Sequence, residues 1–157
     1  MADQIPPLPT RIQLQIVSAD RSLLNETVDE VVIPGFDGYF GVLPGHTPLL
    51  AVLHVGELWY RQGQDKHYVS IAFGFAEVLP DRVTILARVA ERADEIDVDR
   101  ASTSRQRAEE RLAQPKTDVD YERARLALAR SMIRIQVSSR IATGARVGGM
   151  KRLRNES

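Results

Sequence analysis

The spacing of hydrophobic and polar residues changes near Glu95. From Arg11 to about Val89, apolar residues alternate with polar ones or form short runs, as in Ile12-Gln13-Leu14. Glycine and proline separate these segments, at residues 34–35, 37–38, 44–45, 63 and 80. Many short strands divided by regular turn signals predict a sandwich or a barrel.

Beyond Glu95 the composition is rich in Ala, Arg, Glu and Leu, with no glycine until Gly144. These are strong helix formers, and Pro115 interrupts them, so we predict two helices over about 97–113 and 118–140. Asp97 is the expected cap of the first helix, and Thr117 or Asp118 that of the second. The short link favours an antiparallel hairpin.

Both predicted helices have narrow, alanine-rich apolar stripes. The stripe residues are Val98, Ala101, Ala108 and Leu112 in the first helix, and Tyr121, Ala124, Leu128, Met132 and Ile135 in the second. Stripes of this kind allow close contact but bury little apolar surface. We therefore expect a hairpin that can open or dock elsewhere.

Charge divides the chain at the same point. The 157 residues carry 21 basic and 21 acidic side chains. Residues 1–95 hold 7 basic and 13 acidic ones, whereas residues 96–157 hold 14 basic and 8 acidic ones. From Arg123 onward only Glu156 is acidic. This gradient indicates an anionic partner for the second part, and a solvated basic face is the alternative.

Several classes of chemistry have no support in the sequence. The absence of Cys excludes disulfides, thiolate zinc sites and a cysteine nucleophile. No phosphate-binding loop, dinucleotide fingerprint or hydrolase nucleophile motif occurs, and the three histidines lack metal-ligand spacing. No apolar run is long enough to cross a bilayer, and no signal peptide is evident. We therefore expect a soluble protein of a reducing compartment that is not itself an enzyme.

Arginines follow one repeated spacing in both predicted helices. The two trios are Arg100, Arg107 and Arg111, and Arg123, Arg130 and Arg134. At about 100° per residue, each trio lies within roughly 40° on one helix face. If the two faces met, the guanidinium groups would repel unless phosphate or carboxylate oxygens lay between them. The alternative is a solvated stripe with local pairs, such as Arg107 with Glu110.

Four segments of the chain form a recognisable set: residues 43–50 (LPGHTPLL), 77–87 (EVLPDRVTILA), 90–97 (AERADEID) and 118–121 (DVDY). Together they resemble the epsilon subunit family of bacterial F-type ATP synthase. The resemblance covers about residues 11–140 in register. It implies a β-sandwich N-terminal domain followed by a C-terminal antiparallel α-helical hairpin. The expected division is an extension over 1–10, the sandwich over 11–92, the hairpin over 93–140 and a mobile basic tail over 141–157.

The resemblance implies a non-catalytic rotor subunit in the central stalk of the proton-translocating synthase. The sandwich would bind the gamma subunit and the c-subunit ring, with a rotor contact at His46. The hairpin would fold against the sandwich, or extend into the catalytic head and inhibit ATP hydrolysis. In the extended state its basic face, made by Arg123, Arg130 and Arg134, would meet the catalytic beta (and alpha) subunits. The expected location is peripheral, at the cytoplasmic face of the bacterial plasma membrane.

Residues 96–101 read I-D-V-D-R-A and match the I-D-x-x-R-A motif with which some members bind ATP. The resemblance implies ATP as a regulatory ligand, with no required cofactor and no metal. Its arginines would hold the phosphates, and the motif's smaller residues would line the nucleotide. The implied set is Glu91, Ile96, Asp97, Arg100, Ala101, Arg107, Arg130 and Arg134.

Two positions depart from the family pattern. Phe73-Gly74 replaces a common Gly-Gly pair, and Tyr39 and Phe40 stand where many members carry Glu. Two other functions stay open on the residues alone. One is a stand-alone sandwich adaptor whose basic hairpin binds nucleic acid or another anion, although residues 122–157 lack the aromatics that base stacking uses. The other is a small ATP-hydrolysing enzyme, which lacks a phosphate loop.

Overall fold

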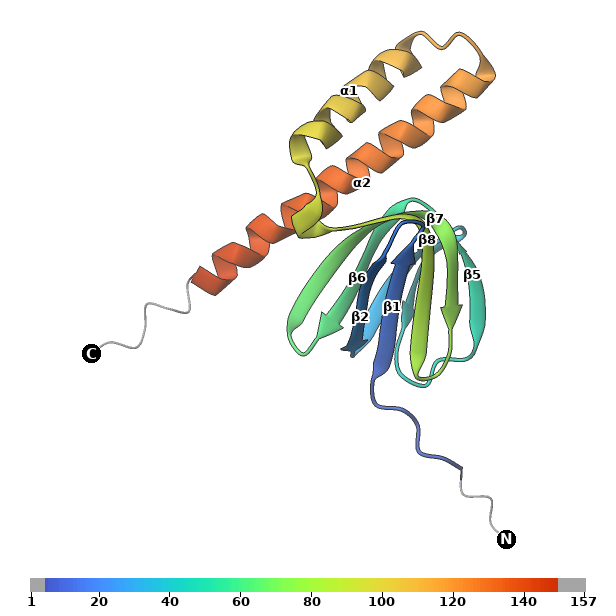
Figure 1. Cartoon of the computed structure of the whole chain (residues 1–157), viewed down its shortest axis with the longest axis vertical. Coiled ribbons are helices and arrows are strands. Elements are labelled where there is room, and N and C mark those ends of the chain that lie inside the picture. Colours follow the sequence, from blue (N-terminus) through green and yellow to red (C-terminus); the bar gives the residue numbers. More distant parts are fainter. Residues whose placement is uncertain (1–4, 150–157) are drawn as a thin grey trace, which may run out of the picture. The chain divides into compact units, whose positions relative to one another are not determined.

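The computed structural model describes residues 5–149, including the side chains of residues 5–141. Its contacts divide the chain into two compact units, one made mainly of strands and a second made of Tyr68–Ser70 and the chain from Glu91 onward. Figure 1 shows the strands in blue to green and the two helices in yellow to red. The predicted order of a β domain followed by two helices is confirmed.

Eight strands make the first unit. They are β1 (Ile12–Ser18), β2 (Ser22–Val28), β3 (Glu30–Gly35), β4 (Gly38–Val42), β5 (Leu49–Leu53), β6 (Gly56–Gln62), β7 (Asp65–Val78) and β8 (Arg82–Arg92). Along the sheet the order is β2-β1-β8-β7-β5-β3-β4, and β6 pairs with β3 and β7. β1 pairs antiparallel with β2, β3 with β4, β5 and β6, and β5 with β7, whereas β1 and β8 run parallel. The predicted sandwich is confirmed.

Alternation along the strands produces the sandwich core. In β1 every second residue is buried, and Ile12, Leu14 and Ile16 are fully enclosed. Val31, Ile33, Leu58, Ile71 and Ile85 come from β3, β6, β7 and β8 and are equally buried. The core is therefore built from large branched side chains that the period-two pattern points inward.

Two strands went unrecognised in the sequence. β2 carries Asn25, Glu26 and Thr27 in a row, which conceals its alternation. β4 contains two glycines and follows a turn, so its local composition resembles a loop. β4 forms because it pairs along β3, with Val31 opposite Val42 and Gly35 opposite Gly38. Pairing partners distant in sequence outweighed weak local propensity here.

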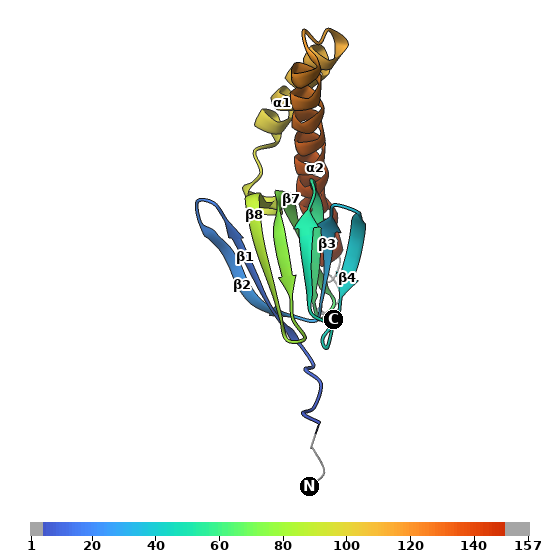
Figure 2. The same cartoon turned by 90° about the vertical axis from the view of Figure 1, so that its right-hand side faces the viewer.

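Among its described residues the second unit contains a short 3₁₀ turn (Ala93–Glu95) and the helices α1 (Val98–Ala113) and α2 (Asp118–Gly149). They lie side by side, joined by a short link, as an antiparallel hairpin (Figure 2). Both predicted caps are present. The Asp97 side chain accepts from the Arg100 amide at 3.0 Å, and Thr117 Oγ1 accepts from the Asp120 amide at 3.1 Å.

Small side chains form the seam between α1 and α2. The buried seam residues are Ala101 and Ala108 in α1 and Ala124 and Ser131 in α2. The predicted apolar stripes also included Val98, Tyr121 and Met132. Their assignment to the contact between the helices is wrong, because these side chains are 44–50% exposed. The reason is the heptad-like spacing of Ala124 and Ser131, which turns small residues rather than the largest ones toward α1.

α2 is longer than the sequence indicates. The predicted helix ends near residue 140, whereas α2 continues to Gly149. The single Gly144 does not end it, because one glycine costs a helix only about 1 kcal/mol. The expected mobile tail over 141–157 therefore begins as helix, and residues 150–157 lie outside the described residues.

Candidate functional site

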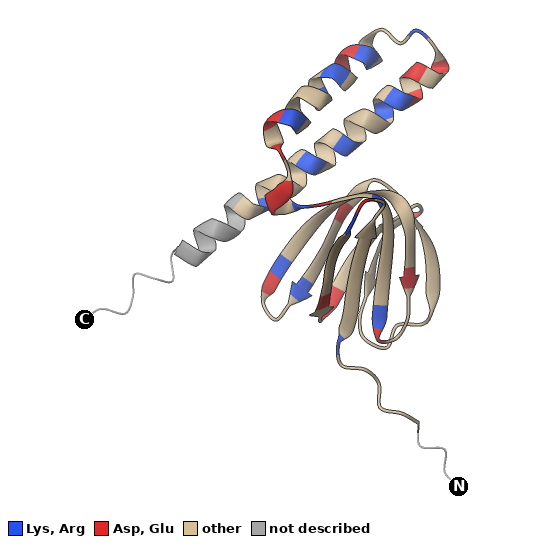
Figure 3. Cartoon of the chain, in the orientation of Figure 1, with Lys and Arg blue, Asp and Glu red and all other residues tan. Residues whose placement is uncertain are grey.

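Four arginines of the hairpin each precede a buried seam residue. Arg100 precedes Ala101, Arg107 precedes Ala108, Arg123 precedes Ala124 and Arg130 precedes Ser131. Two antiparallel helices in contact are related by an approximate two-fold rotation. Residues that directly precede a seam residue therefore lie on the same side of the hairpin in both helices. These four side chains therefore line one side of the hairpin, which we call the arginine side. Figure 3 shows charged residues in both helices of the hairpin.

The arginine side lacks counter-charges within the described residues. Arg105 and Arg125, at other positions on the helices, bind Glu109 at 2.9 Å and Glu122 at 3.0 Å. No ion pair forms at Arg100, Arg107, Arg123 or Arg130 within residues 5–141. The alternative pairing of Arg107 with Glu110 is absent there, and Glu110 instead accepts from Gln106 at 3.4 Å. The side thus presents concentrated positive charge.

Two residues of the implied ATP set bind each other. Arg134 Nε and Nη2 donate to the two carboxylate oxygens of Glu91 at 2.6 and 3.0 Å. Their side chains are only 20% and 25% exposed. A bidentate pair of this kind is geometrically specific and stronger than a typical surface ion pair. It ties α2 to the segment that precedes α1, and a ligand at this place would have to accommodate or replace it.

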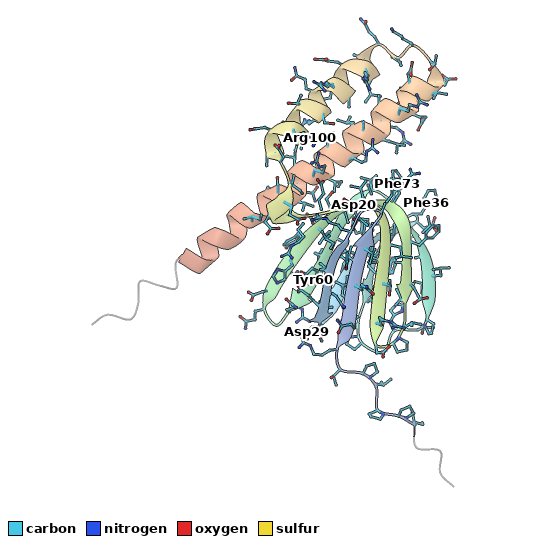
Figure 4. All side chains as sticks on the ribbon, viewed as in Figure 1. Asp20, Asp29, Phe36, Tyr60, Phe73 and Arg100 are labelled. Carbon is cyan, nitrogen blue, oxygen red and sulfur yellow. The ribbon has the colours of Figure 1, made fainter. Side chains whose placement is uncertain are left out.

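The remaining implied residues surround the start of α1. Asp97 caps the helix, Ile96 is 8% exposed, and Ala101 is fully buried in the seam. The Arg100 side chain extends from the first turn of α1 (Figure 4). The structure therefore brings Glu91, Asp97, Arg100 and Arg134 to one end of the hairpin, while Arg107 lies two turns further along α1. Ile96 and Ala101 support the backbone there.

The sandwich carries an exposed apolar surface that the sequence analysis missed. Leu50 (72%), Val52 (52%), Phe75 (54%) and Leu86 (54%) are solvent-exposed, and Val52 pairs with Phe75 across β5 and β7. A pocket of about 740 Å³ adjoins it, lined by residues 35–40 and 49–52. Contiguous exposed apolar surface of this kind marks an interaction site. The sequence did hold a signal for this surface. In β5 (Leu49–Leu53) apolar residues occupy successive positions and therefore both faces of the strand, so one apolar face has to lie outside the core.

His46 lies in the loop between β4 and β5. Its ring Nδ1 is 2.6 Å from the Thr47 carbonyl oxygen, and its side chain is partly exposed. The Gly45 amide donates to the Pro80 carbonyl at 2.7 Å, which anchors the loop to the β7–β8 turn. The predicted role of His46 as a rotor contact stays a prediction.

The two departures from the family pattern have clear structures. Phe73 adopts a φ of 61°, the left-handed region that glycine favours, and its ring meets His54 edge-on with centroids 5.9 Å apart. Phe73 and Phe36 lie at one end of the sandwich, and Asp29 lies at the other (Figure 4). Tyr39 accepts a hydrogen bond at its hydroxyl from the Glu57 amide at 3.1 Å.

Two family models match this chain almost without a gap. The beta-sandwich domain of the ATP synthase delta/epsilon chain matches residues 11–93, and the long alpha-helix domain of the same chain matches residues 94–139. The boundary between the models falls in the 3₁₀ turn. Neither described helix is sufficiently long and apolar to span a membrane.

Individual relatives agree with the family models. An ATP synthase epsilon chain of Syntrophobacter fumaroxidans is 52% identical over 130 residues, covering 83% of this chain and 97% of that protein. One of Nitratidesulfovibrio vulgaris is 49% identical over 126 residues, covering 80% and 94%. A chain in the Euglena gracilis mitochondrial ATP synthase structure, described as OSCP/F1/c-ring, has a TM-score of 0.71 at 26% identity and covers 82% and 81%.

Proposed function

The chain belongs to the ATP synthase delta/epsilon family, and on that premise we propose that it couples the catalytic head to the c-ring and restrains ATP hydrolysis. It serves as a non-catalytic subunit of the central stalk. In this proposal the sandwich is the rotor-binding platform and the hairpin is the movable inhibitory part. The complex translocates protons, and the subunit lies peripherally at the cytoplasmic face of the bacterial plasma membrane.

The exposed apolar surface of β5, β7 and β8 supports the platform role. Leu50, Val52, Phe75 and Leu86 offer a contact that a gamma subunit would cover. The pocket along residues 35–40 and 49–52 and the anchored loop with His46 extend this surface toward the c-ring. The Euglena structure, which contains F1 and a c-ring, is consistent with such a position in the complex.

The composition of the hairpin seam supports the movable role. Burying Ala101, Ala108, Ala124 and Ser131 removes little apolar surface, so opening the seam costs little free energy. An extended α2 would expose Arg123, Arg130 and Arg134 to acidic segments of the catalytic beta and alpha subunits. A small folding energy allows a partner or ligand to shift the population between the two states.

The observation that carries the regulatory part is the selective pairing of arginines. Arg105 and Arg125 have carboxylate partners, while the arginine side has none among the described residues. ATP bound there would neutralise Arg100, Arg107 and Arg130, with Asp97 and Glu91 near the nucleoside. Its phosphates would favour the folded hairpin, because that state alone brings both rows of arginines together. ATP is then a sensor ligand and not a substrate.

A reversible crosslink tests the proposal. The chain has no native Cys, and Ala108 and Ala124 are buried in the same seam, so the double substitution Ala108→Cys and Ala124→Cys should lock the folded hairpin when oxidised. We would add this protein to an epsilon-depleted catalytic head and measure ATP hydrolysis. Oxidised protein should not inhibit, and reductant should restore inhibition. Equal hydrolysis in both states, with binding to gamma confirmed, would overturn the inhibitory role.

A second arm tests the ligand. Arg100→Gln and Arg130→Gln should weaken ATP binding to the isolated chain by at least about tenfold, since each removes a charge-assisted contact. Arg105→Gln removes a guanidinium of the same type that already has a carboxylate partner, so it should leave ATP binding unchanged. An equal loss of ATP affinity in all three variants would indicate non-specific attraction to the positive charge of the hairpin instead of a defined binding site.

A further inference from the structure

A second basic pocket lies at the turn of the hairpin. It has a volume of about 340 Å³ and is lined by Arg111, Gln114, Pro115, Lys116, Asp120 and Arg123. Its residues come from the last turn of α1, the connecting link and the first two turns of α2. None of them except Arg123 has a role in the function proposed above. We propose that this pocket binds a protonated tetrahedral oxyanion, namely phosphate.

The cations of the pocket have no carboxylate partner within the described residues. Arg111, Lys116 and Arg123 form no ion pair there, although Arg125, two residues after Arg123, is bound to Glu122 through two nitrogens. Helix electrostatics account for Arg111, since a cation is favourable at the C-terminus of α1. They do not account for Arg123 in the second turn of α2, where the helix dipole does not stabilise a cation. An anionic ligand shared by Arg111, Lys116 and Arg123 accounts for all three.

The link holds the three cations in a defined arrangement. Pro115 restricts the backbone, and Thr117 caps α2 through its hydrogen bond from the Asp120 amide. Tyr121 closes the first helical turn by donating its amide to the Thr117 carbonyl at 3.0 Å. The N-terminus of α2 therefore points its partial positive charge toward this part of the hairpin and adds to the attraction for an anion.

Asp120 specifies the protonation state of the ligand. A carboxylate accepts hydrogen bonds only, so it repels a fully deprotonated oxyanion and binds one that carries a proton. Phosphate near neutral pH retains at least one proton, whereas sulfate has none. Three cations and one carboxylate also match the charge of hydrogen phosphate. The pocket should therefore prefer phosphate over sulfate, a distinction that simple charge attraction does not make.

Backbone NMR of the full chain tests the site, with inorganic phosphate, sulfate and chloride titrated at constant ionic strength. Phosphate should shift the amides of residues 114–123 saturably, and sulfate should bind at least about tenfold more weakly. Arg111→Gln and Arg123→Gln should each weaken phosphate binding at least about tenfold, whereas Arg125→Gln should not. Asp120→Asn should remove the preference over sulfate. Non-saturating shifts, or equal effects of phosphate and chloride, would overturn the proposal.

An ATP titration distinguishes the two sources of the phosphate group. If the occupant is the terminal phosphate of a nucleotide, ATP should displace inorganic phosphate, and Arg111→Gln should weaken ATP binding. If it is free phosphate, ATP and phosphate should bind together, and Arg111→Gln should leave ATP binding unchanged while Arg100→Gln weakens it. Because none of these titrations measures hydrolysis, the pocket can fail while the inhibitory role stands, and the reverse also holds.

Discussion

The sandwich and the hairpin are held together by different means. The sandwich encloses Ile, Leu and Val side chains from both of its layers, each contributing about 1.5–3 kcal/mol when fully buried. The seam of the hairpin encloses mainly alanine and serine, which contribute a fraction of that. The same chain therefore combines a sandwich with a large apolar core and a hairpin that buries much less apolar surface. The proposed function, in which the sandwich stays bound while the hairpin moves, requires this difference.

Asp29 in the sandwich and the arginine side of the hairpin differ in how their charge is balanced. In the sandwich, Asp29 receives a hydrogen bond from the Gly63 amide and ion pairs from Arg11 and Arg61, so its charge is satisfied internally. On the arginine side of the hairpin the charges have no internal partner among the described residues. Asp29 thus has its counter-charges within the sandwich, whereas the function proposed above supplies those of the arginine side from a bound ligand or partner.

The largest expected effect is on the sandwich, at the bend of β7. Gly74 has a φ of 124°, and a Cβ atom there would lie only 2.0 Å from the Leu86 carbonyl oxygen of β8. Gly74→Ala should lower the free energy of unfolding by at least about 3 kcal/mol. Urea denaturation followed by Trp59 fluorescence would measure this.

Gly63 provides the matched control for Gly74. It also has a positive φ, of 62°, but a Cβ atom there meets nothing within 4 Å. Gly63→Ala should therefore cost only about 1 kcal/mol, the price of the backbone conformation. Similar losses in the two variants would show that β8 can move away from β7.

An intermediate effect is expected in the seam. Ala108→Leu adds a side chain where α1 and α2 are in close contact, which should destabilise the folded hairpin by about 1–3 kcal/mol. Amide exchange in α1 should accelerate, while the urea transition of Trp59 in the sandwich stays unchanged. The exposed Gln106→Leu on the same helix is the control. A shift of the Trp59 transition would contradict the separation of the two parts.

A smaller effect is expected at the pair of Glu91 and Arg134. A double-mutant cycle with Glu91→Gln and Arg134→Gln should give a coupling of about 1 kcal/mol, since the pair is bidentate and mostly buried. The Arg105–Glu109 pair, about half exposed, should give about 0.3 kcal/mol. Hairpin amide exchange is the readout for both cycles. Equal couplings would mean that burial adds nothing to the first pair.

The smallest effect is a pH dependence in the sandwich. The Gly63 amide, and after it Arg11 and Arg61, hold the pKa of Asp29 below its ordinary value of 3.8 against the opposing effect of burial. Because the pKa is lower in the folded state, this stabilisation is present above the unfolded pKa and is lost as pH falls through the folded one. Asp29→Asn should flatten the loss of stability below about pH 4. If the free energy of unfolding fell with pH below about 4 as steeply in Asp29→Asn as in the unmodified protein, this prediction would be contradicted.

Local chemistry made much of the hairpin predictable. Pro115 ends a helix wherever the chain folds, and Asp97 and Thr117 cap helices through amides only three residues away. Inward alternation in β1 likewise needs no knowledge of its partners. These features are decided within a few residues, so the sequence by itself determined a β domain, two helices and their boundary. The match of residues 96–101 to a family motif was visible at the same level.

Contacts between distant residues decided the rest. β4 exists because β3 lies beside it, and Glu91 meets Arg134 across 43 residues. The same applies to the arginine side, since only the packed seam shows which arginines lack a partner. The pocket at the turn and the exposed apolar surface likewise arise from packing. Burial and pairing are properties of the folded chain, and periodicity alone cannot tell a satisfied charge from one that awaits a ligand.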